Sequence, residues 1–389
     1  MFTFGAITLS AAVLSACSSP EGAIPVLRTS GEAVNSAPLT SSAAGQTGTW
    51  ATVALGNLND PLNTFWQLFF LSASSSKWEL ATPPGVASNG GLVATVSPSG
   101  TVTAGFEPSL DLRFSPLAQS ADQGATWAPG VLPGGLALVA DSLAASSGHQ
   151  ELALLRSGGG EVVTSSGDLT NWTTVASTRG LAGDNSTAGC GVKALTAVAF
   201  GASGEDVVGA ACAHGAEPGI FDLVNGNWRS VGPTLPDSTA GPSQVLRLVA
   251  TPSAVTALVS AGEGSARRLF ALWSADGLKS WSISASLPLK GGLKGGSLTS
   301  TGVTPTGGLA VAIKSADGTR SAWVISSPGN QWQKLAPPPA GTSAVVATPS
   351  GGFDALIENQ STLEVDELGS GGWHRIQALA VPIQYGSSG

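Results

Sequence analysis

Charged side chains are scarce in this sequence. Asp, Glu, Lys and Arg make up 11% of its 389 residues and leave a net charge of −8. Proteins that bind nucleic acids present clustered Lys and Arg to the phosphates, so a thinly charged, acidic chain argues against that function. We therefore expect no nucleic-acid partner.

Few residues could hold a metal ion or a cofactor. The three histidines, His149, His214 and His374, are far apart and form no His-x-His or His-x₃-His pair of the kind that binds zinc. The glycine-rich stretches at residues 157–161 and 290–296 lack the Gly-Lys-Ser/Thr ending and the following helix of a phosphate-binding loop. We expect no metal and no cofactor.

The apolar run near the N-terminus is short. Its 13 residues, 4–16, are too few to span a bilayer as a helix, but they match the hydrophobic region of a signal peptide. The run ends in Leu-Ser-Ala-Cys, at Cys17, which resembles the lipobox of bacterial lipoproteins. The resemblance implies a signal peptide at residues 1–16, cleavage before Cys17, and a lipid on the Cys17 sulfur.

The N-terminus departs from the lipoprotein pattern at one point, and two other interpretations of it are possible. No Lys or Arg precedes the apolar run, so either the true start lies upstream or the signal is unusual. An ordinary secretory signal, or a buried first strand with a core cysteine, would also fit. Residues 17–48 are rich in Ser, Ala, Gly, Pro and Thr and show no period, which predicts a flexible tether. We expect a bacterial envelope protein, anchored by lipid to the extracytoplasmic side of its membrane.

Tryptophans recur along the rest of the chain. Seven of them are spaced 49, 45, 56, 53, 51 and 41 residues apart: Trp78, Trp127, Trp172, Trp228, Trp281, Trp332 and Trp373. A repeat near 50 residues is typical of propellers and solenoids. Each unit contains four short β-rich runs separated by Gly, Pro, Asn and Asp, and no sustained helical period appears. Residues 49–389 are therefore predicted to form an all-β, seven-bladed β-propeller of four-stranded antiparallel blades, and we expect a monomer.

The first unit lacks one strand before Trp78. A propeller must close its ring to protect its strand edges, so one terminus should complete this blade. The two candidate segments are AIPVLRTSG, upstream, and LAVPIQYG, at the C-terminus.

One turn motif precedes several of these tryptophans. The stretch SADQGATW, residues 120–127, fits S-x-D-x-G-x-T-W and resembles the Asp-box of the BNR repeat in sialidase-like propellers. In a hairpin, an aspartate can accept hydrogen bonds from its own turn, and a glycine can supply a positive φ. The motif residues are Ser120, Asp122, Gly124, Thr126 and Trp127, with weaker copies at Asp168 and Trp172 and at Asp276 and Trp281.

The catalytic residues of sialidases do not carry over with this resemblance. That family uses a tyrosine nucleophile, whereas the single tyrosine here is Tyr385, near the C-terminal end. No early arginine motif is present, and Arg28 falls in the tether. We expect no enzyme. The alternative is a carbohydrate-active enzyme whose carboxylates are among Glu151, Glu161, Asp206, Glu217, Asp222, Asp354 and Glu364. These acids could equally be ordinary solvated surface residues or residues of hairpin turns.

The two remaining cysteines flank a predicted hairpin. Cys190 and Cys212 lie on either side of a β-rich segment that turns near residues 201–206. Because hairpin partners face each other, and exported cysteines are usually oxidised, we predict a disulfide between them. Two separately buried thiols are the alternative.

The expected function is binding. The longest segments between units, RGLAGDNSTAGCGVK and GPTLPDSTAGPSQ, are polar and glycine-rich. We expect a non-catalytic scaffold that binds an unknown protein or glycan partner or supports assembly. A purely structural envelope protein is a third possibility, after the carbohydrate-active enzyme.

Overall fold

The computed structural model describes residues 40–382, except 46, 57–63, 84–90, 107–114, 133–139, 156–159, 166, 215, 237–240, 252–253, 289–296, 316 and 328–329. The predicted signal peptide, Cys17, the segment AIPVLRTSG and Tyr385 lie outside the described residues. In the part that is described, no helix is long and apolar enough to cross a membrane.

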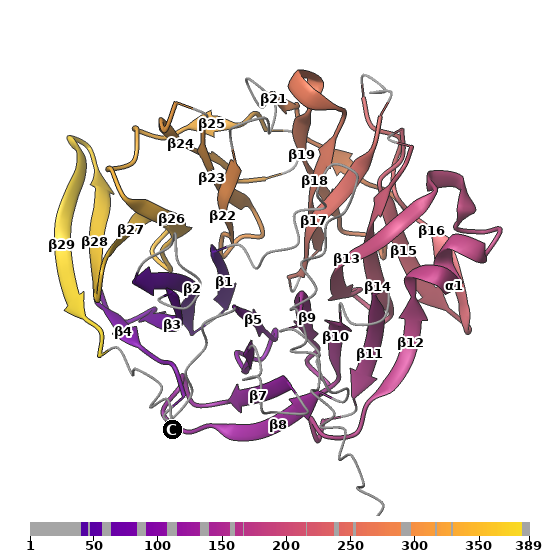
Figure 1. The fold of residues 1–389 in the computed structure, drawn as a ribbon, viewed down its shortest axis with the longest axis horizontal. Coiled ribbons are helices and arrows are strands. Elements are labelled where there is room, and N and C mark those ends of the chain that lie inside the picture. Colours follow the sequence, from indigo (N-terminus) through magenta and orange to yellow (C-terminus); the bar gives the residue numbers. More distant parts are fainter. Residues whose placement is uncertain are drawn as a thin grey trace, which may run out of the picture. The chain divides into compact units, whose positions relative to one another are not determined.

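The described chain is all-β. Its strands follow one another in four-stranded antiparallel meanders (Figure 1). They are β1 (Thr40–Gly45), β2 (Gly48–Gly56), β3 (Thr64–Ser72) and β4 (Trp78–Leu80); β5 (Leu92–Val96), β6 (Val102–Phe106), β7 (Ser115–Ser120) and β8 (Ala128–Leu132); β9 (Ser142–Ala145), β10 (Glu151–Leu155), β11 (Glu161–Ser165) and β12 (Thr173–Ser177); β13 (Val192–Phe200), β14 (Asp206–Cys212), β15 (Gly219–Val224) and β16 (Asn227–Ser230).

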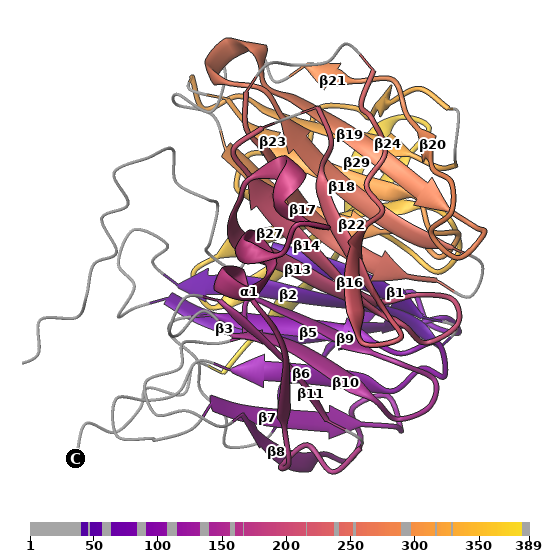
Figure 2. The same cartoon turned by 90° about the vertical axis from the view of Figure 1, so that its right-hand side faces the viewer.

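The later meanders repeat this plan. They are β17 (Ser243–Ala250), β18 (Val255–Ala261), β19 (Arg268–Ser274) and β20 (Ser282–Ile283), with β21 (Leu287–Pro288) also on β19; β22 (Ser297–Val303), β23 (Leu309–Lys314), β24 (Arg320–Ile325) and β25 (Gln333–Lys334); β26 (Thr342–Ala347), β27 (Phe353–Asn359), β28 (Thr362–Gly369) and β29 (Gly372–Ala380). The helical elements are α1 (Thr178–Gly183), η2 (Ala188–Cys190) and η3 (Gly264–Ala266), and α1 lies against β12 and β13 (Figure 2).

The first strands of the meanders lie innermost (Figure 1). Contacts join β1 to β5, β5 to β9, β9 to β13 and β13 to β17, and they also join β22 to β26 and β26 to β1. In addition, β1 pairs in parallel with β22, where Ser41 faces Thr301 and Ser42 faces Gly302. The N-terminal meander therefore packs against the meanders from the C-terminal part of the chain.

Strand β1 corrects one boundary of the sequence analysis. Residues 40–45 were placed in the tether, but they form the innermost strand of the β1–β4 meander and pair with β2 and β22. The sequence Thr-Ser-Ser-Ala-Ala-Gly has no hydrophobic alternation to signal a strand. Its small side chains suit a tight site: a Cβ added to Gly302 would lie 2.4 Å from Ser42 Oγ.

The hydrophobic core lies between neighbouring meanders. One cluster joins Phe69 and Trp78 to Leu356 and Val365, so the first and last described meanders share a core. Burying each such side chain contributes about 1.5–3 kcal/mol. Four of the seven recurring tryptophans add polar contacts to these seams, because their indole N–H groups donate to backbone carbonyls of the preceding meander: Trp172 to Val131 (2.8 Å), Trp228 to Val175 (3.3 Å), Trp281 to Val231 (2.7 Å) and Trp373 to Ala336 (3.1 Å).

Candidate functional site

The connection between β12 and β13, residues 178–191, contains both α1 and η2, and we call it the α1–η2 connection. Ser177 caps α1 by accepting a hydrogen bond from the Gly180 N–H (3.0 Å). The Thr178 N–H donates to Gly160 O (2.9 Å), which ties the start of the connection to the loop before β11. The connection is thus anchored where it leaves the β-sheet.

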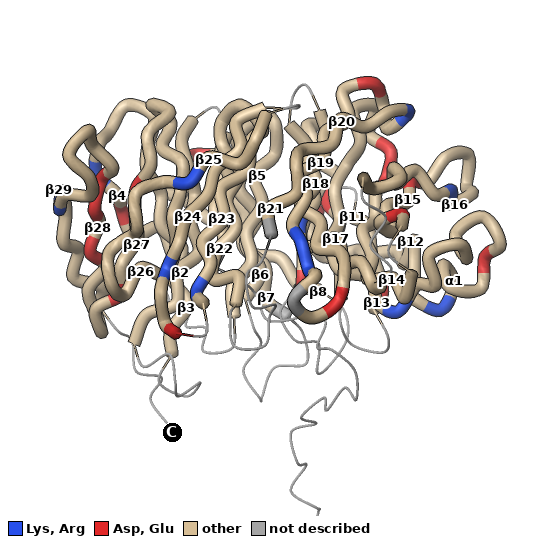
Figure 3. The backbone as a smooth tube through the Cα atoms, turned by 90° about the horizontal axis from the view of Figure 1, so that it is seen from above, with Lys and Arg blue, Asp and Glu red and all other residues tan. Residues whose placement is uncertain are grey.

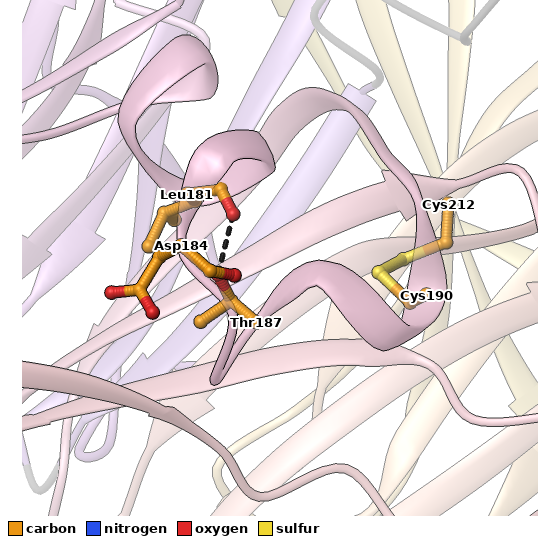
Figure 4. The surroundings of a disulfide bond; sticks show 5 residues. All are labelled: Leu181, Asp184, Thr187, Cys190 and Cys212. Carbon is orange, nitrogen blue, oxygen red and sulfur yellow. Dashed lines mark hydrogen bonds between the residues drawn. A yellow bond between two sulfur atoms is a disulfide. The ribbon is translucent and has the colours of Figure 1, made fainter.

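A disulfide holds the other end of the connection. Cys190 and Cys212 are bonded, with their Cα atoms 5.2 Å apart (Figure 4), so the disulfide prediction is confirmed. A link that closes a loop of this size stabilises the folded state by about 3 kcal/mol in the chain-entropy model. Between the helices, the Thr187 hydroxyl donates to the Leu181 carbonyl (Figure 4). The backbone of the connection is therefore fixed at both ends and in the middle.

Asp184 and Ser186 fix the exposed bend between α1 and η2. The Ser186 N–H donates to Asp184 Oδ1 (2.8 Å), and this bond is the main reason that the pKa of Asp184 is lowered. The Ser186 hydroxyl lies 2.6 Å from Trp228 O and 2.7 Å from Asp184 Oδ1, so its proton can be donated to either acceptor. The first of these contacts links the bend to β16 of the next meander.

The α1–η2 connection leaves most of its side chains in solvent. Leu181, Thr187 and Cys190 are buried and serve as anchors. The exposed residues are small or polar, and they are Arg179, Gly180, Ala182, Gly183, Asp184, Asn185, Ser186, Ala188 and Gly189. An ordered backbone with exposed polar groups binds a partner at a lower entropic cost than a flexible loop does. The second predicted loop, GPTLPDSTAGPSQ, is only partly described; there Leu235 is buried and its N–H donates to Ala216 O (2.9 Å).

The turns predicted from the Asp-box lie at the opposite ends of the strands, between the third and fourth strands of their meanders, and we call these the turn ends. Asp122 accepts hydrogen bonds from the N–H (2.8 Å) and hydroxyl (2.5 Å) of Thr126 and from the Ser120 hydroxyl (2.8 Å). These bonds lower the pKa of Asp122 to about 2, and the bond from the Thr126 hydroxyl contributes most to the shift. Gly124 has a φ of 90°, which glycine adopts without strain.

The two weaker copies make similar contacts. Asp276 accepts from the hydroxyl (2.5 Å) and N–H (3.0 Å) of Ser280, which lowers its pKa to about 2. Asp168 accepts from the N–H groups of Asn171 (2.9 Å) and Thr170 (3.0 Å), and the Asn171 bond is the largest cause of its lowered pKa. In each of the three turns the carboxylate oxygens are occupied by the turn itself.

The tryptophans of these turns lie just before the fourth strands and face the preceding meander. Trp127 is half-buried against the cluster around Trp50, with the two rings edge to face and 6.3 Å apart. Trp172 and Trp281 make the seam hydrogen bonds given above. The turn tryptophans are thus part of the packing between sheets.

Three of the carboxylates considered for catalysis are buried, which corrects their interpretation as surface groups. Asp222 is fully buried and forms two hydrogen bonds with Arg229, of 2.8 and 2.7 Å. Glu151 Oε1 accepts from the Thr103 hydroxyl (2.9 Å) and the Gln119 side chain (2.9 Å), while its Oε2 has no partner in the described chain. Burial raises the pKa of Glu151 to about 8.

Asp354 is buried at the seam between the first and last described meanders. Its Oδ2 accepts from the Trp78 indole N–H (2.8 Å), whereas burial is the dominant effect and raises its pKa to about 6. Glu151 and Asp354 belong to separate seams, so the structure does not bring them together. Of the other acids considered for catalysis, Glu364 pairs with Arg375 (2.7 Å) and Glu217 is exposed. No group of three or more His, Cys, Asp and Glu among the described residues is arranged to hold a metal ion.

The comparisons with known proteins identify the fold. No protein-family model matches the chain, and no curated protein matches it in sequence. Among solved structures, the chain is similar to a "putative 6-phosphogluconolactonase" from Bacteroides uniformis at 13% identity and a TM-score of 0.52, with 86% of this chain and 97% of that one covered. A protein of the same description from Bacteroides fragilis matches at 12% identity and a TM-score of 0.52, with coverages of 86% and 96%.

A third similar structure belongs to a study of two prolyl endopeptidases. It matches at 14% identity and a TM-score of 0.50, and covers 90% of this chain but 50% of that one. These matches support a propeller-like fold. They also contradict the prediction that the chain is no enzyme, because the structures that share its fold include proteins described as enzymes. At such identities the likeness concerns the fold alone and assigns no activity.

Proposed function

We propose that this chain is a lipid-anchored, extracytoplasmic β-propeller of seven blades that binds a protein or glycan partner through the α1–η2 connection. The seven blades are the meanders β1–β4, β5–β8, β9–β12, β13–β16, β17–β20, β22–β25 and β26–β29. The Asp122, Asp168 and Asp276 turns stabilise the connections between third and fourth strands, as Asp-box turns of a propeller would. The tether holds the domain away from the membrane.

The observation that carries the proposal is the order of the α1–η2 connection. Its buried anchors and the Cys190–Cys212 disulfide fix the backbone, while the exposed side chains of Arg179 and Asn185 make no hydrogen bond or ion pair with the described residues. Surface loops with stabilised backbones and free polar side chains are common binding elements on rigid scaffolds.

The binding proposal is tested by affinity capture from detergent-solubilised membranes. The full chain is compared with Arg179→Ala/Asn185→Ala and with the matched control Lys279→Ala/Thr170→Ala, whose residues are exposed at the turn ends. We expect the first pair to lose a partner that the parent and the control both retain. Equal capture by all three proteins would contradict binding through the connection.

The anchor is tested separately at Cys17. Cys17→Ser should move the protein from the membrane fraction to the medium, or leave an uncleaved precursor. Mass spectrometry of the mature protein should find an acylated Cys17. A free Cys17 thiol on a membrane-bound mature protein would disprove the lipid anchor without affecting the binding proposal.

A further inference from the structure

Arg247, on an innermost strand, has no carboxylate partner among the residues that the structure describes. It lies on β17, and its guanidinium reaches the junction of β1 and β22. Its Nη1 donates to Thr301 O (3.2 Å) and Thr301 Oγ1 (3.0 Å), and its Nη2 donates to Ser42 O (2.8 Å). All three acceptors are neutral, and none of the ion pairs recorded for the described residues includes Arg247.

The surroundings of Arg247 make its charge costly. Burial lowers the pKa of Arg247 to about 10, although the residue keeps part of its surface exposed to solvent. A buried charge that lacks a counter-charge destabilises a protein, since its lost hydration is not replaced. The described residues supply no anion to offset this cost, whereas the more exposed Arg229 and Arg375 both pair with carboxylates.

Two donor groups of the guanidinium remain available. Arginine has five N–H donors, and the described contacts use two on Nη1 and one on Nη2. The Nε–H and the second Nη2–H are left, and Nε and Nη2 share the edge of the guanidinium that forms bidentate contacts with carboxylates and phosphates.

The innermost strands have a positive charge balance in an otherwise acidic protein. Lys, Arg, Asp and Glu are few and scattered over the described chain (Figure 3). The described first strands β1, β5, β9, β13, β17, β22 and β26, however, contain only two charged residues, and these are Lys193 and Arg247. Two cations and no acid on the described parts of these strands favour a ligand of negative charge.

We propose that Arg247, held in place by Thr301 and the Ser42 carbonyl, binds an oxyanion group, a carboxylate or a phosphate, of a small-molecule ligand at the innermost strands. Arg247 provides the bidentate contact, and the exposed Lys193 contributes long-range attraction. This site is separate from the α1–η2 connection, so it can exist whether or not the connection binds a partner.

The wild-type full chain gives the first test, by protection from the arginine reagent phenylglyoxal. Inorganic phosphate and acetate are the two probes, with chloride at matched ionic strength as the control. Peptide mass spectrometry follows modification of Arg247 and of Arg268, whose guanidinium contacts only the Ser286 hydroxyl among its recorded partners. At ten times its dissociation constant, a bound anion leaves roughly a tenth of the sites free, and so should slow modification of Arg247 about tenfold.

Phosphate or acetate should protect Arg247 and leave Arg268 unchanged, and the stronger of the two probes identifies the preferred group. Equal modification of Arg247 in phosphate, acetate and chloride would overturn the proposal, as would protection of both arginines alike. Failure of Arg247 to react in chloride would also overturn it, because the guanidinium would then be inaccessible to a ligand.

Thermal unfolding of variants gives the second test. Phosphate or acetate should raise the Tm of the wild type and of Arg268→Met, but not that of Arg247→Met. If Arg247→Met does not fold, Arg247→Lys replaces it: a lysine keeps the charge but lacks the bidentate edge, so the Tm rise should shrink. An undiminished rise in a folded Arg247 variant would refute the site.

Discussion

The two ends of the meanders use polar side chains in opposite ways. At the turn ends, Asp122, Asp168 and Asp276 accept hydrogen bonds from their own turns, so their carboxylates are occupied. In the α1–η2 connection, buried anchors and a disulfide order the backbone, and the exposed Arg179 and Asn185 are left available. The carboxylates of the turns, like Asp184 in the connection, are thus occupied by local hydrogen bonds, whereas Arg179 and Asn185 of the connection are exposed.

This contrast predicts a separation of effects. Changes at the turn ends should reduce stability and leave binding unchanged. Changes to exposed side chains of the connection should do the reverse. The disulfide is the exception that joins the two, because it both stabilises the fold and orders the connection.

The largest expected effect is the loss of a turn tryptophan. Trp127→Ala should destabilise the protein by about 3 kcal/mol. This value is at the low end of the range for replacing a buried aromatic side chain by alanine, because Trp127 is only half-buried against Trp50. Chemical denaturation measures the change, and Trp127→Phe, which keeps an aromatic ring, should lose less. A Trp127→Ala protein as stable as the parent would show that this seam does not depend on the indole.

Removal of the disulfide should have an effect of nearly the same size. Cys190→Ala/Cys212→Ala should cost about 3 kcal/mol in the chain-entropy model. Hydrogen exchange should also become faster in residues 178–191 and remain unchanged at the Asp168 turn. Unchanged exchange in the connection would mean that the disulfide is not what orders it.

Glu151 should make stability depend on pH in an unusual direction. Its folded pKa, about 8, lies above the reference value of 4.5. The protonated form is therefore favoured in the folded state, and its contribution is complete below pH 4.5 and lost as the pH rises through 8. Glu151→Gln should gain stability relative to the parent between pH 5 and 8, as thermal unfolding at each pH would measure. Parallel pH profiles for the two proteins would contradict this assignment.

The smallest effect is expected at Asp122, which is exposed. Its lowered pKa means that its contribution is present above the reference value of 3.8 and is lost as the pH falls toward 2. Asp122→Ala should lower the Tm at pH 7 by less than Trp127→Ala does, and the difference from the parent should disappear near pH 2. A Tm difference that persists at pH 2 would show that the carboxylate charge is not responsible.

The sequence predicted the repeating part of the fold well, because the repeat has local signals. Tryptophan spacing and turn residues located the four-stranded units, and the spacing of Cys190 and Cys212 predicted their bond. Strand β1 was missed, since Thr-Ser-Ser-Ala-Ala-Gly carries no strand pattern and is ordered by partners as distant as β22.

The buried charges could not be predicted for the same reason. Glu151 is enclosed by side chains from β6 and β7, Asp354 by Trp78, and Arg247 by Ser42 and Thr301. Each environment is formed by residues distant in sequence, so composition alone favours the solvent-exposed interpretation. The prediction that the chain is no enzyme was wrong for another reason. It relied only on the missing catalytic residues of sialidases, whereas the fold is shared with proteins described as enzymes of other kinds.

The proposed role of the α1–η2 connection is tested most directly by photo-crosslinking from the two ends of β12. A photoreactive residue is introduced at Asn185, in the connection, or at Thr170, in the Asp168 turn, and both positions are exposed. The full-length chains are irradiated in native membranes, and crosslinked products are identified by mass spectrometry. We predict one specific protein or glycan adduct from position 185 that is absent from position 170. The same adducts from both positions, or none from position 185, would contradict binding through the connection.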